Sequence, residues 1–470
     1  MKKIFLFSAL VAAATAMNAK VTLPKIFSDN MVMQQQTEAN LWGNADANAT
    51  VKITTSWNKK TIKVTADSEG KWKASVETPA AGGPYSITFS DGEKTELKNI
   101  LVGELWICSG QSNMEMPMKG FKNQPVENAV EDILHGGDDQ MRLFTVKRTS
   151  KFEPATDVVG NWQEASPESL RDFSATAYYF GRELRRILGV PVGLIVTSWG
   201  GSSCEAWMNR DWLKAFPQIE LPVSQETIKS KNRTATVLYN GMLRPLIGVK
   251  MRGVIWYQGE ENVSRSGYYA DLFSRMIKGW REEWQEGDFP FYYCQIAPYD
   301  YSLIKWGEYN SAFLREQQAK AEMMNDNVGM AVLMDGGLEY GIHPRKKQLA
   351  GMRLALLALG KTYGIKGING ESARFKSVEF KGDTAVVSFE RADMWIYGKN
   401  GLKSDLVEVA GADRVFHPAK AWIERSKLYV RSEEVKEPVA VRYAFHDWAD
   451  GDLFCDGLPV SSFRTDNWEK

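Results

Sequence analysis

The hydrophobic and polar positions follow two different rhythms along the chain. From Lys20 to about Asn99, short β-rich runs with alternating polarity are separated by turns, as at 51–57, 61–66 and 85–90. Alternation of this kind, with a turn every 8 to 12 residues, is typical of a small β-sandwich. We therefore expect an N-terminal β-sandwich-like domain over 20–99.

From Ile100 onward, unbroken apolar runs alternate with longer helical patterns. The apolar runs cover 101–108, 192–197, 253–257, 291–296 and 329–334, and the helical patterns cover 174–188, 268–284, 311–324 and 344–360. Apolar strands without alternation belong to a parallel sheet that is covered on both faces. The pattern predicts a doubly wound α/β domain over 100–365. After Gly364 the β texture returns, which predicts a second β domain over 366–470.

The N-terminus has the pattern of a secretory signal peptide. Lys2 and Lys3 precede an apolar run over 4–16, and small residues follow at Ala14, Ala16 and Ala19. The run is shorter than the roughly 20 residues of a membrane span. We expect a signal peptide over 1–19 and a soluble exported protein, periplasmic or secreted, without membrane insertion.

Composition narrows the function classes. The chain has 470 residues, more than one core of about 150 residues requires. Its 58 basic and 58 acidic residues leave no net charge, so nucleic acid is not an expected partner. The four cysteines, Cys108, Cys204, Cys294 and Cys455, are widely spaced, which favours buried free thiols over a disulfide framework.

Ligands of open α/β sheets bind beyond the carboxyl ends of the strands, so the residues that follow each apolar run matter most. The first run leads into a glycine-containing turn with Ser112, a candidate nucleophile. The alternative is that Ser112 or Asn113 only caps the next segment. The second run leads into glycines at 200–201, and the third into Gln258; both segments offer hydrogen-bond donors for an oxyanion.

A serine nucleophile needs a base, and the chain has four histidines: His135, His343, His417 and His446. Only His343 follows a predicted strand of the α/β domain. Pro344 comes next, and we expect it at the first position of a helix. The alternative for His343 is a helix cap. No cluster with metal-ligand spacing is visible, so we expect neither a metal nor a cofactor.

Four segments, GQSNM (110–114), SWGGS (198–202), WYQGE (256–260) and IHPRKKQ (342–348), resemble the SGNH (GDSL-like) hydrolase superfamily, and specifically the sialate O-acetylesterase-like carbohydrate esterases. The resemblance extends to 20–35 and 441–468, and so covers nearly all of the chain after residue 19. It implies a three-layer doubly wound parallel sheet flanked by β-sandwich-like domains.

The resemblance also implies roles for single residues. Ser112 matches the nucleophile, and its own N–H contributes to the oxyanion hole. Gly201, rather than Gly200, matches the second donor, and Gln258 takes the place of the third. His343 matches the general base.

The acidic partner of the histidine departs from the superfamily pattern. The superfamily usually has an aspartate three residues before the histidine, where this chain has Tyr340, followed by Gly341. Asp335 and Glu339 are the nearby carboxylates, and we favour Asp335 because it follows a strand. A Ser-His dyad, with His343 oriented by a backbone carbonyl, is the alternative.

The function implied is an exported serine esterase that removes O-acetyl groups from sugars, chiefly from 9-O-acetyl sialic acid. The side chains expected to line the substrate site are Gln111, Asn113, Trp199, Glu260 and Arg345. An arginine such as Arg345 would meet the sialate carboxylate. Acetylated plant polysaccharides, such as xylan or xyloglucan, are the alternative substrates.

Two further function classes are weighed against the esterase. Glu260 and Glu261 beside Trp256 would suit a glycosidase only if a distant carboxylate completed the pair, and no such partner stands out. A non-catalytic carbohydrate-binding protein with two β modules would leave Ser112 and His343 without a purpose.

Overall fold

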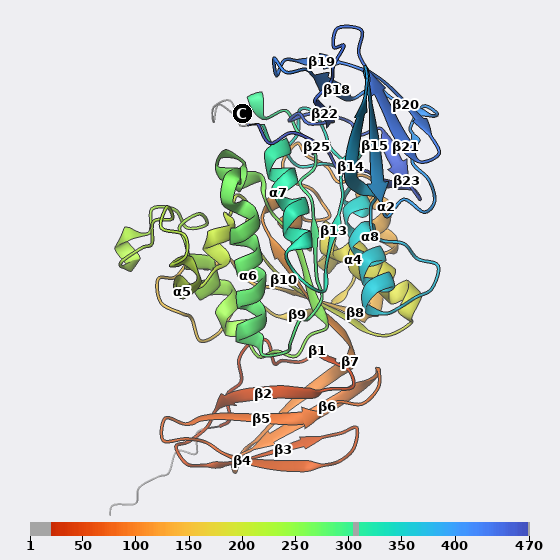
Figure 1. Cartoon of the computed structure of the whole chain (residues 1–470). Helices are drawn as coiled ribbons and strands as arrows, with labels where there is room; N and C mark the ends of the chain where they lie inside the picture. The colour runs from red at the N-terminus through yellow and green to blue at the C-terminus, as the bar shows by residue number, and fades with distance from the viewer. Residues whose placement is uncertain (1–19, 304–309, 469–470) are drawn as a thin grey trace, which may run out of the picture.

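The computed structural model describes residues 20–303 and 310–468. The predicted signal peptide over 1–19 lies outside the described residues. Three parts follow one another along the long dimension of the molecule in Figure 1. These are an N-terminal β part, a central α/β part and a C-terminal β part.

The central part is built on a sheet with the strand order β13-β12-β11-β7-β10-β8-β9. Its strands are β7 (Lys94–Gly110), β8 (Asp138–Thr145), β9 (Trp162–Ala165), β10 (Val192–Ser198), β11 (Gly253–Tyr257), β12 (Phe291–Cys294) and β13 (Val328–Ala331). Every neighbouring pair from β13 to β8 is parallel, and β9 adds an antiparallel edge. The predicted parallel sheet is therefore present, while β8 and β9 were not foreseen.

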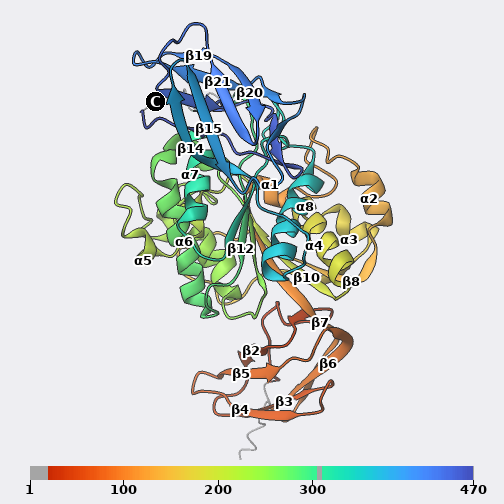
Figure 2. The ribbon, with the colours of Figure 1, turned by 45° about the vertical axis from the view of Figure 1, so that its right-hand side comes forward.

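Helices cover both faces of this sheet. In Figure 2, α4 (Ala175–Leu188) and α8 (Lys347–Leu357) lie on one side, and α6 (Tyr269–Trp284) and α7 (Ala312–Met323) lie on the other. The shorter helices are α1 (Ser112–Glu115), α2 (Ala129–His135), α3 (Pro167–Arg171) and α5 (Arg210–Leu213), with 3₁₀ and π segments at η1 (Cys204–Trp207), η2 (Gln225–Thr227), η3 (Tyr239–Leu243), η4 (Arg244–Leu246), η5 (Glu260–Tyr268), η6 (Tyr301–Leu303) and η7 (Ala358–Thr362).

The prediction that Pro344 opens a helix is wrong. The helix α8 begins at Lys347, with Lys346 as its N-cap. The Arg345 carbonyl accepts hydrogen bonds from the N–H groups of Glu127 and Lys347, so the backbone before α8 forms turns rather than a helical ladder. His343 therefore lies in a loop before α8, and the Glu127 N–H makes a hydrogen bond to this loop.

The N-terminal part contains β1 (Val32–Gln34), β2 (Glu38–Asn44), β3 (Thr50–Thr55), β4 (Thr61–Thr65), β5 (Lys71–Glu77) and β6 (Gly82–Ser90). The strands β2 and β5 pair with each other, while β6 pairs with β3 and with β7. The 17-residue strand β7 continues from this part into the central sheet. The boundary predicted between residues 99 and 100 thus falls inside one strand, at the point where alternating exposure changes to complete burial.

The C-terminal part consists of three small sheets with the orders β14-β15-β21-β20-β17, β19-β18-β22-β25 and β16-β23-β24. The strands are β14 (Arg374–Lys381), β15 (Thr384–Glu390), β16 (Tyr397–Gly398), β17 (Lys403–Ser404), β18 (Val407–Ala410), β19 (Phe416–Pro418), β20 (Lys420–Glu424), β21 (Lys427–Arg431), β22 (Ala440–Tyr443), β23 (Leu453–Cys455), β24 (Leu458–Pro459) and β25 (Phe463–Arg464).

The C-terminal part contacts the segments that follow β12 and β13. The Gly451 N–H donates to the Met334 carbonyl at 3.0 Å, and the Tyr299 N–H donates to the Asp447 carbonyl at 3.1 Å. This part therefore lies at the end of the central sheet where ligands of α/β folds bind.

All four cysteines are buried and free, as the sequence predicts. Over 20–303 and 310–468, no helix is long and apolar enough to cross a membrane.

Candidate active site

Ser112 follows β7 directly and begins α1. Gly110 makes this turn possible, because its φ is +138° and an added Cβ would lie 2.1 Å from the Tyr257 carbonyl oxygen. The Gln111 N–H then donates to the same carbonyl at 2.9 Å. Ser112 is 9% exposed, and its hydroxyl has no hydrogen-bond partner in the part of the chain that the structure describes. This hydroxyl is free to react.

The glycine turn after β10 lies beside the serine. A Cβ added to Gly200 would lie 3.3 Å from the Ser112 Cβ. The Gly200 N–H donates to Glu115 Oε2 at 2.7 Å and is occupied. The Gly201 N–H, in contrast, meets no acceptor among residues 20–303 and 310–468. The Ser112 N–H is also free, since the first N–H groups of a helix have no partner within the helix. Two N–H groups, one on Ser112 itself and one on the neighbouring glycine turn, are therefore unoccupied among the described residues.

Gln258 does not offer a third free donor, contrary to the sequence prediction. Its side chain is completely buried. Its Nε2 donates to the Ser202 carbonyl at 3.1 Å and to Asn262 Oδ1 at 2.7 Å, and its Oε1 accepts from the Tyr269 hydroxyl at 2.8 Å. An amide has two N–H hydrogens, and both are used. Gln258 braces the glycine turn from behind.

His343 has an uncharged hydrogen-bond partner. Its Nδ1 contacts Gln124 Oε1, and the edge of the Phe121 ring packs on the imidazole with 5.1 Å between centroids. Because an amide oxygen only accepts, Nδ1 carries the proton and Nε2 carries the free electron pair. Burial, together with the Lys347 ammonium, lowers the pKa of His343 to about 4. The imidazole is therefore neutral at neutral pH, as a general base must be.

The structure does not bring Asp335 to His343. Both carboxylate oxygens of Asp335 accept from the Arg353 guanidinium, at 2.6 and 2.7 Å. Asp335 lies four residues beyond the end of β13, so it is not the strand-end position that the sequence predicts. Within the described ranges, Gln124 is the one hydrogen-bond partner of the imidazole, so Glu339 does not bond it either. The sequence analysis missed Gln124, because nothing in the surrounding loop marks it.

Asn113 and Glu260 lie behind the serine rather than on a surface open to substrate. Asn113 is 1% exposed and Glu260 is 3% exposed. Asn113 Nδ2 donates to Glu260 Oε1 at 2.5 Å and to the Ile342 carbonyl at 3.1 Å, and Asn113 Oδ1 accepts from Lys347 Nζ. The expectation that these two side chains line the substrate site is wrong in this structure, since their polar atoms face each other and Lys347.

The remaining predicted substrate contacts divide into two groups. Gln111 is 3% exposed, and its Oε1 accepts from the N–H groups of Gly259 and Glu261, so it too is internal. Trp199 is half-buried beside the serine turn, with Arg148 5.8 Å above its ring. Arg345 is exposed, and its guanidinium has no partner in the described residues. Only Trp199 and Arg345 are open to solvent.

Comparisons with known proteins identify the family of the chain. Residues 102–337 match the family model described as carbohydrate esterase, sialic acid-specific acetylesterase. The sialate O-acetylesterase of Rattus norvegicus is 30% identical over 416 residues, covering 75% of this chain and 76% of the relative. The human sialate O-acetylesterase is 30% identical over 392 residues, covering 75% and 73%. A solved carbohydrate acetylesterase from Xanthomonas citri is 35% identical, with a TM-score of 0.86 over 95% of this chain and 100% of that one.

The chain belongs to this carbohydrate esterase family. It is a carboxylic ester hydrolase, which sets aside the glycosidase and the non-catalytic binding protein. The match to the family model begins within β7, spans Ser112 and Gly201, and ends at residue 337, before the loop that carries His343.

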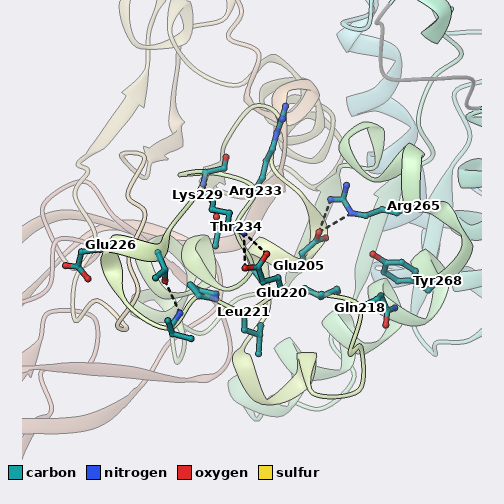
Figure 3. Close-up of a pocket in the computed structure, with 16 residues that line it drawn as sticks. Glu205, Gln218, Glu220, Leu221, Glu226, Lys229, Arg233, Thr234, Arg265 and Tyr268 are labelled. Carbon is teal, nitrogen blue, oxygen red and sulfur yellow. Dashed lines mark hydrogen bonds and ion pairs between the residues drawn. The ribbon is translucent and has the colours of Figure 1, made fainter.

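This carbohydrate esterase has a cavity of about 640 Å³, and none of Ser112, Gly201 and His343 lines it. Glu205, Glu220, Arg265 and Tyr268 are among the residues that line it, and Figure 3 shows the Glu205–Arg265 ion pair at its side. Arg233, which also lines it, donates to the Gly201 carbonyl at 3.4 Å and pairs with Glu261 at 3.1 Å. Arg233 therefore joins the lining of this cavity to the glycine turn.

Proposed function

We propose that this carbohydrate esterase removes O-acetyl groups from sugars with Ser112 as nucleophile and His343 as general base. The observation that carries the proposal is that the Ser112 hydroxyl has no partner among the described residues and that the glycine turn with the free Gly201 N–H lies beside Ser112. The Asn113–Ile342 hydrogen bond supports it as well, because it joins the residue after Ser112 to the residue before His343.

In the first half-reaction, Ser112 Oγ attacks the acetyl carbonyl carbon while His343 Nε2 takes the hydroxyl proton. The N–H groups of Ser112 and Gly201 donate to the oxygen that becomes negatively charged, as in an oxyanion hole. The tetrahedral intermediate then collapses, the C–O bond to the sugar breaks, and the imidazolium gives its proton to the sugar oxygen.

In the second half-reaction, water attacks the acetylated serine with His343 again as base. Acetate leaves, and the proton returns to Ser112 Oγ. Each step uses only this chain's own groups and water.

For the substrate, we propose O-acetylated sialic acid, with acetylated plant polysaccharide as the second candidate. The names of the curated relatives support the first. The exposed Arg345 also supports it, because a guanidinium without a partner suits a carboxylate. The proposal includes export through the segment 1–19.

The test is acetate release from O-acetylated sialic acid and from acetylated xylan, measured in parallel with Ser112→Ala as control. Release from either substrate that is abolished by Ser112→Ala supports the serine mechanism. Arg345→Ala should then raise KM for the sialate ester only. Equal activity of Ser112→Ala and the unmodified enzyme would overturn the proposal, and preference for xylan would assign the second substrate.

A further inference from the structure

Among residues 20–303 and 310–468, no carboxylate bonds His343 in the way that the acid of a Ser-His-acid triad orients its histidine. In such a triad the carboxylate accepts from Nδ1, holds the tautomer and stabilises the imidazolium. Here the nearest candidate, Asp335, is held by Arg353 through two hydrogen bonds. Arg353 is 3% exposed, and its Nη1 also donates to the Val332 carbonyl at 2.8 Å, so the pair is fixed. Some other group must position the imidazole.

The ring itself is held by Gln124. The turn that carries Gln124 is closed by two reciprocal backbone hydrogen bonds between Phe121 and Gln124, each of 3.0 Å. This closure presents Gln124 Oε1 to Nδ1 and places the Phe121 ring edge-on against the imidazole. The amide oxygen accepts the hydrogen bond from Nδ1 and so fixes the tautomer, as a triad carboxylate oxygen does. Unlike the carboxylate, it carries no negative charge.

The backbone of the His343 loop is held by Asn113. The Asn113 amide donates to the Ile342 carbonyl, and its orientation is set by Glu260 on one side and Lys347 on the other. Its own carbonyl accepts from the Thr176 hydroxyl at 2.9 Å, which ties it to α4. Since Asn113 follows Ser112 and Ile342 precedes His343, one amide sets the spacing between nucleophile and base.

We propose that Gln124 and Asn113 are positioning residues that together replace the triad carboxylate, Gln124 by orienting the imidazole ring and Asn113 by fixing its loop to the nucleophile turn. This inference rests on the proposed Ser112–His343 mechanism. It assigns the acid position of this enzyme to two neutral amides and leaves Asp335 a structural role with Arg353.

The charges around the imidazole agree with this assignment. Within the described residues, Lys347 of α8 is the charged group that acts on His343, while Gln124 and Phe121 on the facing turn are neutral. Glu260 lies beyond Asn113 and acts on Lys347. No negative charge on the described part of the chain therefore stabilises the imidazolium directly.

The test compares Gln124→Ala, Gln124→Glu and Asn113→Ala in hydrolysis of 4-nitrophenyl acetate and in the rate at which a fluorophosphonate labels Ser112. Misplacing the base costs about 10- to 100-fold in rate. We expect Gln124→Ala and Asn113→Ala to lower kcat and the labelling rate by about this factor, with KM nearly unchanged. Gln124→Glu restores an acceptor, so its kcat should recover. Its acid limb should move up by about 1 to 3 pH units, because a carboxylate favours the imidazolium.

Gln140→Ala and Asn325→Ala are the matched controls, since Gln140 contacts Asp139 and Asn325 contacts Ser274 and Ala321. Asn113→Asp keeps the shape of Asn113 but lacks the amide donor. This variant replaces Asn113→Ala in the test if Asn113→Ala does not fold. Wild-type kcat in Gln124→Ala and in Asn113→Asp would overturn the inference. A folded Asp335→Asn variant with a lower kcat and a shifted acid limb would also overturn the inference, because Asp335 would then act as the triad carboxylate. Full activity in Ser112→Ala would instead contradict the underlying mechanism.

Discussion

At the scale of single residues, the site depends on which polar groups are left free. The Ser112 hydroxyl and the Gly201 N–H have no partner in the described chain, whereas the Gln111 amide oxygen and both N–H hydrogens of the Gln258 amide make hydrogen bonds. All four residues follow strands and carry suitable atoms, so their positions in the sequence look equivalent. The contacts made in the folded protein decide which of these groups are hydrogen-bonded within the protein and which remain free.

The low pKa of His343 predicts an unusual pH dependence. As the proposed general base, His343 works only when it is unprotonated, and its pKa lies near 4 rather than 6.5. We expect kcat/KM to stay high on acidification and to fall only near pH 4. In Lys347→Met the repelling charge is lost, so the pKa of His343 should rise and the acid limb should move to higher pH. A pH profile of both proteins checks this, and an unmoved limb in folded Lys347→Met would contradict it.

The occupied amide of Gln258 predicts an effect on folding. In Gln258→Ala the Ser202 carbonyl, Asn262 and the Tyr269 hydroxyl lose a buried partner, which costs about 1 to 3 kcal/mol for each unsatisfied group. We expect a lower melting temperature in a thermal scan, with activity reduced through the displaced turn. An unchanged melting temperature with kcat lowered about 100- to 1000-fold would instead mark Gln258 as an oxyanion donor.

At the scale of elements, strand β7 links the N-terminal β part to Ser112, the proposed nucleophile. Its first residues pair with β6, and its last residues pair with β10 and β11. The hydrophobic pattern predicts most central strands and helices to within a few residues, because burial on both faces leaves long apolar runs. The same pattern places a domain boundary inside β7. Along this one strand the side chains change from alternating exposure to complete burial, and in the sequence this change looks like the end of one element and the start of another.

The end of β7 tolerates only glycine at position 110. In Gly110→Ala the new Cβ would lie 2.1 Å from the Tyr257 carbonyl oxygen and would force β7 away from β11. We expect a lower melting temperature and a large loss of kcat. Gly189→Ala is the control, because Gly189 also has a positive φ but no atom lies within 4 Å of its added Cβ. Its cost should be about 1 to 2 kcal/mol of backbone strain, with activity kept. Equal behaviour of the two variants would exclude the clash as the cause.

At the scale of the whole molecule, the C-terminal part is joined to the catalytic end of the sheet. Arg315 of α7 is completely buried and donates to Ser462, to the carbonyls of Ala444 and His446, and to Ser311. Burial lowers the pKa of Arg315 to about 10, so it remains charged at neutral pH. This one side chain connects α7 to several C-terminal segments.

Replacing that connection should weaken the entire protein. Arg315→Met leaves several buried acceptors without a donor, which costs about 3 kcal/mol or more in unfolding free energy. We expect a lower denaturation midpoint and lower activity, because the segments after β12 and β13 contact the same part. Arg431→Met is the control, since Arg431 is 54% exposed and pairs only with Asp383. Unaltered stability in Arg315→Met would show that the two parts hold together without it.

The sequence by itself determined the class of fold and offered the serine turn, the glycine turn and the histidine as candidates, because strand periodicity and glycine-rich strand ends are local features. Only the tertiary structure decided that Asp335 pairs with Arg353, that Gln124 reaches His343, and that Asn113 and Gln258 face inward. These contacts join positions that are far apart or in irregular loops. Their partners are set by how the loops meet at the end of the sheet, which no local pattern of residues encodes.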